Sequence, residues 1–507
     1  MLARHPEQFW PPLGGGRTPT KEGLELSRRR PALATGAVLM ILAVCLSGCS
    51  STPHGLPPNT PVIARSPLPR TTPSSIDLRG IHKIKHVIVV MQENRSFDSY
   101  FGTFPGADGI PMRAGKPAPC LPTPNGGACM SPFHDPSLEN AGGAHATTDA
   151  IDDIDGGRMD GFAKRALLGR AGCLVLNGTP FPACNQVTAH PDALGYHDSR
   201  EIPNYWTYAR RFALQDHMFS STLGPSLPAH LYMVSGWSAS CSSVTDPMSC
   251  TSNNGLAGSL HPVTSGDFQY AWTDLTYLLH KNHVSWAYYV APHSLPDCDE
   301  NIPMCTRPSL EPGTPSLWNP LPEFTTVIHN HQLGNIQHHN AFFSAARAGT
   351  LPSVSWIVPN KQHSEHPPAS VADGQAWVTR VVNAVMRSPD WKSSAIFISW
   401  DDWGGFYDHV VPPRVDRAGY GIRVPSLVIS PYAKRHYIDH QVLSFDAYLK
   451  FVEDDFLHGA RIDPRTDGRP DSRPDVREDA PQLGNLIKDF DFSKRRPKLI
   501  LPPRPSP

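Results

Sequence analysis

Three short apolar runs rich in β-branched residues constrain the fold more than any other feature of the sequence. They occupy residues 87–91, 395–400 and 426–430. Such runs, without polar alternation, are typical of parallel strands buried on both faces of a sheet. Residues 377–386 and 444–456 carry apolar side chains at helical spacing. Strands of this kind together with helices predict a layered α/β domain.

Polar side chains follow two of these runs directly. Glu93 and Asn94 follow the first, and Asp401 and Asp402 follow the second. In open α/β sheets, ligands bind beyond the carboxyl ends of the strands. Two adjacent aspartates at a buried strand end repel each other unless a cation neutralises them, and Gly404 just downstream allows the chain to leave strand geometry. These oxygen-rich residues therefore predict a site for a divalent cation.

Arg95 and Asp98 continue the polar segment after the first run. The pattern assigns them no chemistry. We expect them to form a local ion pair that holds the loop.

A serine supplies a possible nucleophile. Ser226 follows a sharp Gly-Pro turn and precedes an apolar helical pattern in "GPSLPAHLYMVSG". A hydroxyl at a helix N-terminus beside a cation can attack phosphorus. The alternative is that Ser226 only caps the helix, which is a common role of serine. The stretch alone leaves both interpretations open.

Histidines are concentrated in the stretch "PNKQHSEHPPAS". It holds His363, Glu365 and His366 within four positions. Such a cluster is typical either of metal and phosphate ligands or of a surface loop. His145 and His409 add further imidazoles elsewhere in the chain.

The N-terminus is predicted to direct export. Residues 28–30 are arginines and precede an uncharged stretch at 32–46, which is too short to span a bilayer comfortably. The stretch ends in "LSGC", which resembles a bacterial lipobox, so we expect cleavage before Cys49 and a lipid on its thiol. An ordinary secretory signal or an uncleaved anchor is the alternative.

The organisation expected from these features has three parts. Residues 1–49 form a lipoprotein-type signal peptide, and residues 50–80 form a tether rich in Pro, Ser and Thr. Residues 81–507 form a single catalytic domain with loop insertions. The protein is expected to be exported, either as a cell-envelope lipoprotein held to the membrane through Cys49 or in secreted form.

The sequence has ten cysteines. Cys45 lies in the predicted signal peptide and Cys49 is expected to carry the lipid, and the other eight form pairs of close neighbours in sequence. Spacing alone does not determine how they pair, but four short loops in an exported protein suggest four disulfides. A zinc site is the alternative, although no CxxC or HxxxH pattern supports it. The expected pairs are Cys120–Cys129, Cys173–Cys184, Cys241–Cys250 and Cys298–Cys305.

The charge balance argues against nucleic acid as a partner. The formal net charge is −1, and no long run of Lys and Arg follows the N-terminus. Binding to a phosphate backbone normally needs a basic surface.

Several long motifs occur in a characteristic order. They include "HVIVVMQENRSFDSYFG", "GGRMDGF", "SSTLGPSLPAHLYMVSG", "SEHPP", "WDDWGGFYDHVVPP" and "DFDFSKRRP". From about residue 81 to 500 the chain resembles the bacterial phospholipase C and acid phosphatase family of phosphoesterases, within the alkaline-phosphatase-like superfamily. The resemblance implies a three-layer α/β/α sandwich with a mostly parallel central sheet and a metal-assisted covalent mechanism.

The resemblance also implies the roles of individual residues. Glu93, Asn94, Asp401 and Asp402 would bind a divalent metal ion of unspecified identity, and Ser226 would be the nucleophile.

The histidines receive their expected roles from the same resemblance. His145, His363, His366 and His409 would hold phosphoryl oxygens or protonate the leaving group. Glu365 would orient a neighbouring histidine.

The expected activity is hydrolysis of phosphate esters, with phospholipase C-type cleavage of a phosphodiester, such as a phospholipid, through a phosphoserine. The phospholipase branch usually has threonine at the nucleophile position and an Asn-Arg pair soon after it, whereas this chain has Ser226 and then Ala229-His230. Serine is typical of the acid phosphatase branch, so a phosphomonoesterase is the main alternative. A sulfatase would need arginine in place of His230, and a non-catalytic surface lipoprotein is the other alternative.

Overall fold

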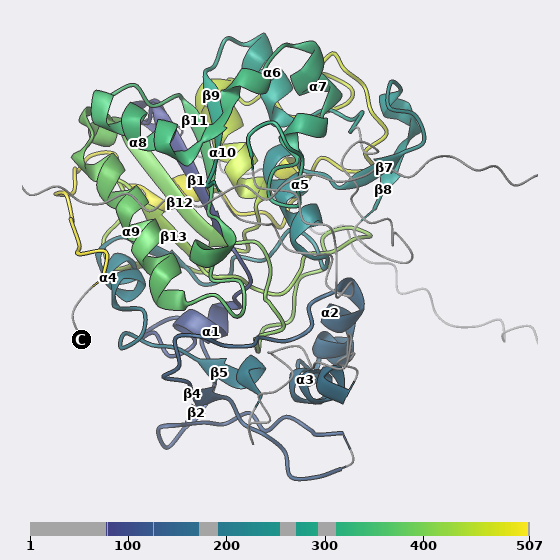
Figure 1. The fold of residues 1–507 in the computed structure, drawn as a ribbon, viewed down its shortest axis with the longest axis vertical. Coiled ribbons are helices and arrows are strands. Elements are labelled where there is room, and N and C mark those ends of the chain that lie inside the picture. Colours follow the sequence, from purple (N-terminus) through teal and green to yellow (C-terminus); the bar gives the residue numbers. More distant parts are fainter. Residues whose placement is uncertain are drawn as a thin grey trace, which may run out of the picture. The chain divides into compact units, whose positions relative to one another are not determined.

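A central sheet organises the part of the chain that the structure, a computed structural model, describes: residue 78 and residues 80–124, 126–171, 191–253, 270–292 and 311–504. The sheet has eight strands in the order β10-β9-β11-β1-β12-β13-β6-β14 (Figure 1). Their bounds are β1 (His86–Gln92), β6 (Ala213–Gln215), β9 (Trp286–Val290), β10 (Ile336–His338), β11 (Val354–Val358), β12 (Ser394–Trp400), β13 (Ser426–Ile429) and β14 (Tyr437–Asp439).

Most neighbouring strands of this sheet are parallel. β1 pairs in parallel with both β11 and β12, and β9 pairs in parallel with β10 and β11. β13 is the exception, because it runs antiparallel to β12 and to β6. The predicted parallel orientation of residues 426–430 is therefore wrong. The chain passes from β12 to β13 through a loop without a helix, whereas a parallel neighbour is usually reached through a crossover helix.

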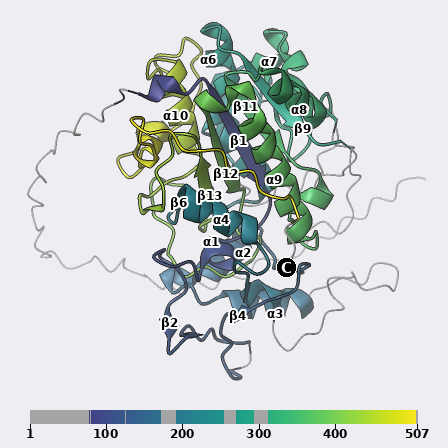
Figure 2. The same cartoon turned by 90° about the vertical axis from the view of Figure 1, so that its left-hand side faces the viewer.

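Helices cover both faces of the sheet. Side chains three positions apart on a strand point to opposite faces. Phe397 on β12 contacts Tyr448 of α10 (Asp446–Phe456), with ring centroids 5.3 Å apart. Trp400 on the same strand contacts Tyr205 of α4 (Pro203–Arg211) at 5.2 Å. Figure 2 shows α10 on one side of the sheet and α9 (Val371–Arg387) on the other. The predicted α/β class with a mostly parallel central sheet is confirmed, as an α/β sandwich.

The helices in the described residues begin and end as follows: α1 (Phe97–Phe101), α2 (Thr147–Ile154), α3 (Phe162–Ala171), α4 (Pro203–Arg211), α5 (Ser226–Ser235), α6 (Leu275–Lys281), α7 (Thr325–His329), α8 (His339–Ala348), α9 (Val371–Arg387) and α10 (Asp446–Phe456). Short strand pairs lie outside the sheet: β2 (Met112–Arg113) with β3 (Lys116–Pro117), β4 (Phe133–His134) with β5 (Gly195–Tyr196), and β7 (Ala239–Cys241) with β8 (Cys250–Ser252). The predicted helices at 377–386 and 444–456 correspond to α9 and α10.

The apolar strands are buried, as their composition predicts. Residues 87–91 of β1 are at most 1% exposed, and β12 is buried along its whole length. Burying this apolar surface against the two helical layers is the main stabilising contribution to the fold. Residues 75–507 form one compact unit.

Two of the expected disulfides are present, Cys120–Cys129 and Cys241–Cys250. The other four cysteines, the predicted signal peptide at 1–49 and nearly all of the predicted tether at 50–80 lie outside the described residues. Among the described helices, none combines the length and apolar character that crossing a membrane requires.

Candidate functional site

The ends of β1 and β12 bring the predicted acidic residues together. These strands are parallel neighbours, with Gln92 in register with Trp400. The residues that follow, Glu93 and Asp401, therefore leave the sheet at the same edge. Glu93, Asn94, Asp401 and Asp402 are all 0% exposed.

A network of hydrogen bonds joins these two strand ends. The Asn94 backbone N–H donates to Asp401 Oδ1 at 2.9 Å, and the Asn94 side-chain amide donates to Asp402 Oδ1 at 3.1 Å. The Gly404 N–H donates to the same Asp402 oxygen at 2.7 Å. Gly404 has φ +62°, and a Cβ at this position would lie 2.6 Å from the Asn94 carbonyl oxygen. Only glycine fits this close approach, so the Gly-Gly pair is part of the site.

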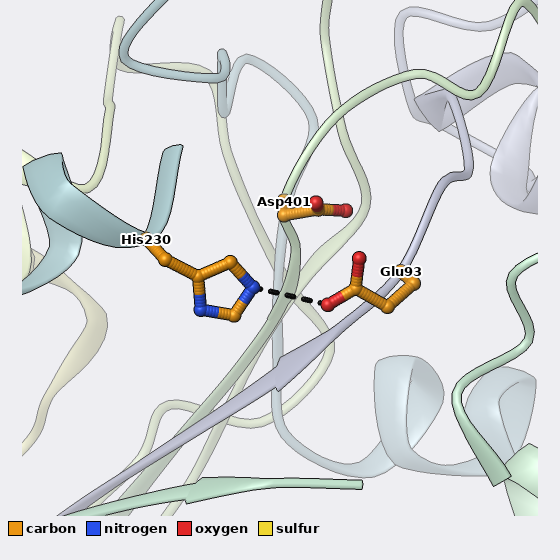
Figure 3. A group of neighbouring side chains, drawn as sticks. All are labelled: Glu93, His230 and Asp401. Carbon is orange, nitrogen blue, oxygen red and sulfur yellow. Dashed lines mark hydrogen bonds and ion pairs between the residues drawn. The ribbon is translucent and has the colours of Figure 1, made fainter. Parts of the chain in front are cut away.

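Helix α5 supplies two side chains to the same carboxylate. His230 Nε2 lies 3.0 Å from Glu93 Oε1 (Figure 3). The Ser226 hydroxyl donates to Glu93 Oε2 at 3.2 Å. Ser226 and His230 are four residues apart, so they lie on one face of the helix. Pro225 is the N-cap residue, and Ser226 is the first residue of the helix. The Ser226 side chain therefore contacts Glu93 instead of capping the helix.

His230 is a member of the site that the sequence interpretation did not include. Burial lowers the pKa of His230 to about 4, although the charge of Asp401 opposes the shift. The ring is therefore neutral near pH 7, and its Nε2–H donates to Glu93. The spacing Ser226-x-x-x-His230 was the available signal, because it places the imidazole one helical turn from the predicted nucleophile.

The donor set fits a divalent cation. One ligand atom each from Glu93, His230 and Asp401 lies within 4.8 Å of the others. Asp401 Oδ2 and Asn94 Oδ1 are buried and have no hydrogen-bond partner among the described residues. Unsatisfied buried oxygens and neighbouring carboxylates are costly without a positive charge. Carboxylate and amide oxygens are the ligands that hard divalent ions prefer.

Two of the predicted histidines lie beside this cluster. His145 Nε2 accepts a hydrogen bond from the Asn94 amide at 2.6 Å, while His145 Nδ1–H donates to the Gly143 carbonyl at 2.9 Å. The rings of His145 and His366 are 5.7 Å apart. His366 Nδ1–H donates to the Pro367 carbonyl at 2.8 Å. Both imidazoles are thus oriented through Nδ1, which assigns the basic lone pair to Nε2.

The other two predicted histidines contact different groups. His409 Nδ1 pairs with Asp98 at 2.7 Å, in a second cluster with Asp408. His363 lies at the end of the 3-10 turn Lys361–His363 and hydrogen-bonds Asn360 at 2.6 Å. No hydrogen bond of either ring to Glu93, Asn94, Asp401 or Asp402 occurs in the described part of the chain.

Glu365 hydrogen-bonds no histidine among the described residues, so the prediction that it orients a neighbouring histidine is wrong. Its carboxylate accepts hydrogen bonds from Tyr100, Tyr205 and the Trp400 indole, at 2.6, 2.5 and 3.0 Å. Burial raises the pKa of Glu365 to about 7, although the two tyrosine hydrogen bonds oppose the shift. Helix α4, which the sequence did not predict, explains the difference, because it brings Tyr205 against Trp400 at the end of β12.

The predicted Arg95–Asp98 ion pair is also wrong. Arg95 donates to the Asn94 carbonyl, the Tyr100 hydroxyl and the Asn140 side chain. Asp98 instead pairs with Arg423 at 3.1 Å and with His409. Asp98 is the second residue of the short helix α1, and its side chain contacts His409 in the loop after β12.

Comparison with known proteins agrees with this geometry. The model of the "Phosphoesterase family" matches residues 84–457. The chain is 26% identical over 415 residues to "Non-hemolytic phospholipase C" of Burkholderia pseudomallei, covering 74% of this chain and 55% of that protein. It is 26% identical over 425 residues to "Phospholipase C A" of Mycobacterium tuberculosis, covering 74% and 73%. It is 25% identical over 385 residues to "Non-specific phospholipase C6" of Arabidopsis thaliana, covering 69% and 62%. The chain thus spans about half the length of the Burkholderia relative.

Proposed function

Because this chain belongs to the phosphoesterase family, we propose that it is a metal-dependent hydrolase of phosphoric ester bonds, acting mainly as a phospholipase C-type phosphodiesterase. The observation that carries the proposal is the contact between the Ser226 hydroxyl and Glu93, inside a cluster of buried carboxylates. An alkaline-phosphatase-like architecture is part of the same proposal, supported by the mostly parallel sheet and by the site at its carboxyl edge.

Ser226 is the proposed nucleophile. Glu93 accepts the hydrogen bond of its hydroxyl, and the N-terminus of the ten-residue helix α5 stabilises negative charge on its oxygen. A divalent ion held by Glu93, Asn94, Asp401 and Asp402 would supply the positive charge that lowers the pKa of the hydroxyl and offsets the charge of the phosphoryl oxygens.

The reaction proceeds through Ser226 in two displacements. The bond from Ser226 Oγ to phosphorus forms as the bond to the ester alcohol breaks. The hydroxyl proton of Ser226 passes to Glu93, which accepts its hydrogen bond, and the departing alcohol takes a proton from the imidazole of His145 or His366. Water then attacks the phosphoserine and gives its proton to that imidazole, while the bond from phosphorus to Ser226 Oγ breaks and Glu93 returns the proton to Oγ. Both rings are oriented for this by their Nδ1 hydrogen bonds to backbone carbonyls.

A phosphomonoesterase is the second candidate. The serine at position 226 favours it, since the phospholipase branch that the chain resembles usually has threonine there. The same residues would act on a phosphate monoester, so the two candidates differ in substrate and share the site.

The test compares a choline phosphodiester with a phosphate monoester, each as its 4-nitrophenyl ester at matched concentration, on purified protein of measured metal content. We expect Ser226→Ala to lower turnover of the preferred substrate by about a thousandfold or more, with metal content and thermal unfolding unchanged. Ser240→Ala, at an exposed serine, is the matched control. Undiminished turnover in the Ser226 variant would refute the nucleophile assignment.

We also propose that residues 1–49 direct export and that Cys49 carries a lipid that holds the protein in the cell envelope. The support is the sequence pattern alone. Labelling with a fatty-acid analogue should be lost in Cys49→Ser and retained in Ser226→Ala. Equal labelling of both variants would place the lipid elsewhere.

A further inference from the structure

Helices α8 and α9 contact each other (Figure 1). Residues of both helices line a groove of about 660 Å³. Its lining includes three arginines, Arg347 on α8 and Arg380 and Arg387 on α9, together with His339, His363 and Trp377. The groove therefore collects cationic and N–H donor groups on one side of the sheet.

The positive charge of this groove is not neutralised by its own lining, which contains no carboxylate. Neither Arg380 nor Arg387 makes a hydrogen bond or ion pair with any residue that the structure describes, and Arg347 donates to the Ser344 hydroxyl at 3.0 Å. Asp373, one turn before Trp377, pairs with Arg504. Partial burial and the charge of Arg504 lower the pKa of Arg380, although the charge of Asp373 opposes the shift.

A buried donor in the groove also lacks an acceptor. Trp377 is 1% exposed, and its indole Nε1–H has no hydrogen-bond partner within the described ranges. His339 Nδ1 is likewise buried without a partner. Burial, with the nearby His363, lowers the pKa of His339 to about 4, so this ring is neutral near pH 7. Buried N–H groups without acceptors are costly and call for an explanation.

The groove is preformed, because its far wall is fastened to α9. Asn383 donates to the Leu501 carbonyl at 2.8 Å and accepts from the Leu501 N–H at 3.2 Å. Asn204 on α4 donates to the Pro502 carbonyl at 2.8 Å. These bonds hold Pro503, which lines the groove, in place.

We infer that this groove binds a phosphate-bearing anion at a site separate from the Glu93 cluster. Planar guanidinium groups and an indole N–H match the oxygens of phosphate, and within the described residues Arg380 and Arg387 make no ion pair with a carboxylate. The ligand could be a soluble phosphate compound or a lipid head group, since both present the same group. His363, three residues before His366, thereby becomes a ligand-binding residue of the groove. The inference does not depend on the proposed hydrolysis.

The test counts phosphate sites by isothermal titration of the whole protein with inorganic phosphate. We expect the double variant Arg380→Gln/Arg387→Gln to weaken one site by about a hundredfold, since each charge-assisted contact contributes about tenfold. Arg435→Gln, at an exposed arginine near the opposite edge of the sheet, is the matched control and should leave binding unchanged. Inhibition of turnover by phosphate reports the catalytic site separately and should be the same in all three proteins.

Trp377→Phe keeps an aromatic side chain but removes the indole N–H, so it should weaken the same site by about fivefold. Co-sedimentation with vesicles of phosphatidylcholine and phosphatidylglycerol identifies the ligand source. Binding that the double variant abolishes indicates a lipid head group, whereas phosphate binding without vesicle binding indicates a soluble ligand. If neither phosphate nor vesicles bind, or if the double variant Arg380→Gln/Arg387→Gln binds both as the wild type does, the inference is overturned.

Discussion

The buried Arg423 pairs with the acidic residues of the second cluster, Asp98 and Asp408, and its contribution to the stability of the fold can be tested directly. Arg423 is 0% exposed, and its Nε donates to Asp408 at 2.9 Å while Nη2 donates to Asp98 at 3.1 Å. Its Nη1 donates to the carbonyl oxygens of Asp108 and Asp216, each at 2.8 Å. We predict that Arg423→Met strongly destabilises the protein, because two buried carboxyl groups lose their counter-charge.

The magnitude follows from the burial of all three side chains. Removing one partner of a buried ion pair costs about 3–5 kcal/mol, whereas an exposed pair contributes about 0–1 kcal/mol. Burial raises the pKa of Asp408 to about 6, although Arg423 opposes the shift, so the substitution should raise this pKa further. A carboxyl whose pKa is higher in the folded than in the unfolded state stabilises the fold at low pH and loses that contribution as pH rises. The cost of the substitution should therefore be greatest above pH 7 and smaller at pH 5.

The assay is denaturant unfolding at pH 5, 6, 7 and 8, with Arg435→Met as the matched control at an exposed arginine. The control should change the free energy of unfolding by about 0.5 kcal/mol or less. A loss below about 1 kcal/mol at pH 7 for Arg423→Met, or a loss that does not vary with pH, would refute this reasoning.

Three further predictions concern the metal, a buried carboxyl group and a disulfide. Asp401→Asn should lower bound metal and turnover together by more than about tenfold, and chelation of the wild type should abolish turnover until a divalent ion is restored; metal analysis and a turnover assay check this. Because the raised pKa of Glu365, about 7, makes the folded state retain a proton, stability should fall as pH rises from 5 to 7 by up to about 1.4 kcal/mol per pH unit. Glu365→Gln should flatten that slope in unfolding experiments, and an unchanged slope would assign it to another group. Replacing Cys241 and Cys250 by serine should lower the free energy of unfolding by about 2–3 kcal/mol. A reductant that breaks this disulfide should destabilise the wild type by the same amount, and the variant should lack this contribution.

The sequence predicted those parts of the site that follow from short, contiguous stretches of residues. The apolar run before Glu93 and the one before Asp401 identified two strands, and their shared sheet edge followed from the rule for parallel strands. The orientation of β13 was not predictable from its composition, because buried parallel and buried antiparallel strands have the same apolar content.

Partners of buried charges were the least predictable feature. Asp98 is three residues from Arg95 but pairs with Arg423, which is 325 residues away in sequence. Ion pairs of this kind depend on where a loop returns, and no local pattern encodes that. His230 was overlooked for a related reason, since its interaction with Glu93 needs α5 to pack against the end of β1.

The contacts of the candidate site also bear on how the chain reaches its native state. Glu93 meets Ser226 across 133 residues of sequence, and Asn94 meets Asp401 across 307. Both neighbours of β1 in the described sheet, β11 and β12, come from the second half of the chain. Closing such long loops is slow, so chains with this topology fold more slowly than chains whose contacts are mostly local. The cluster can assemble only after the centre of the sheet has formed, and recovery of its ligand binding during refolding reports completion of that step.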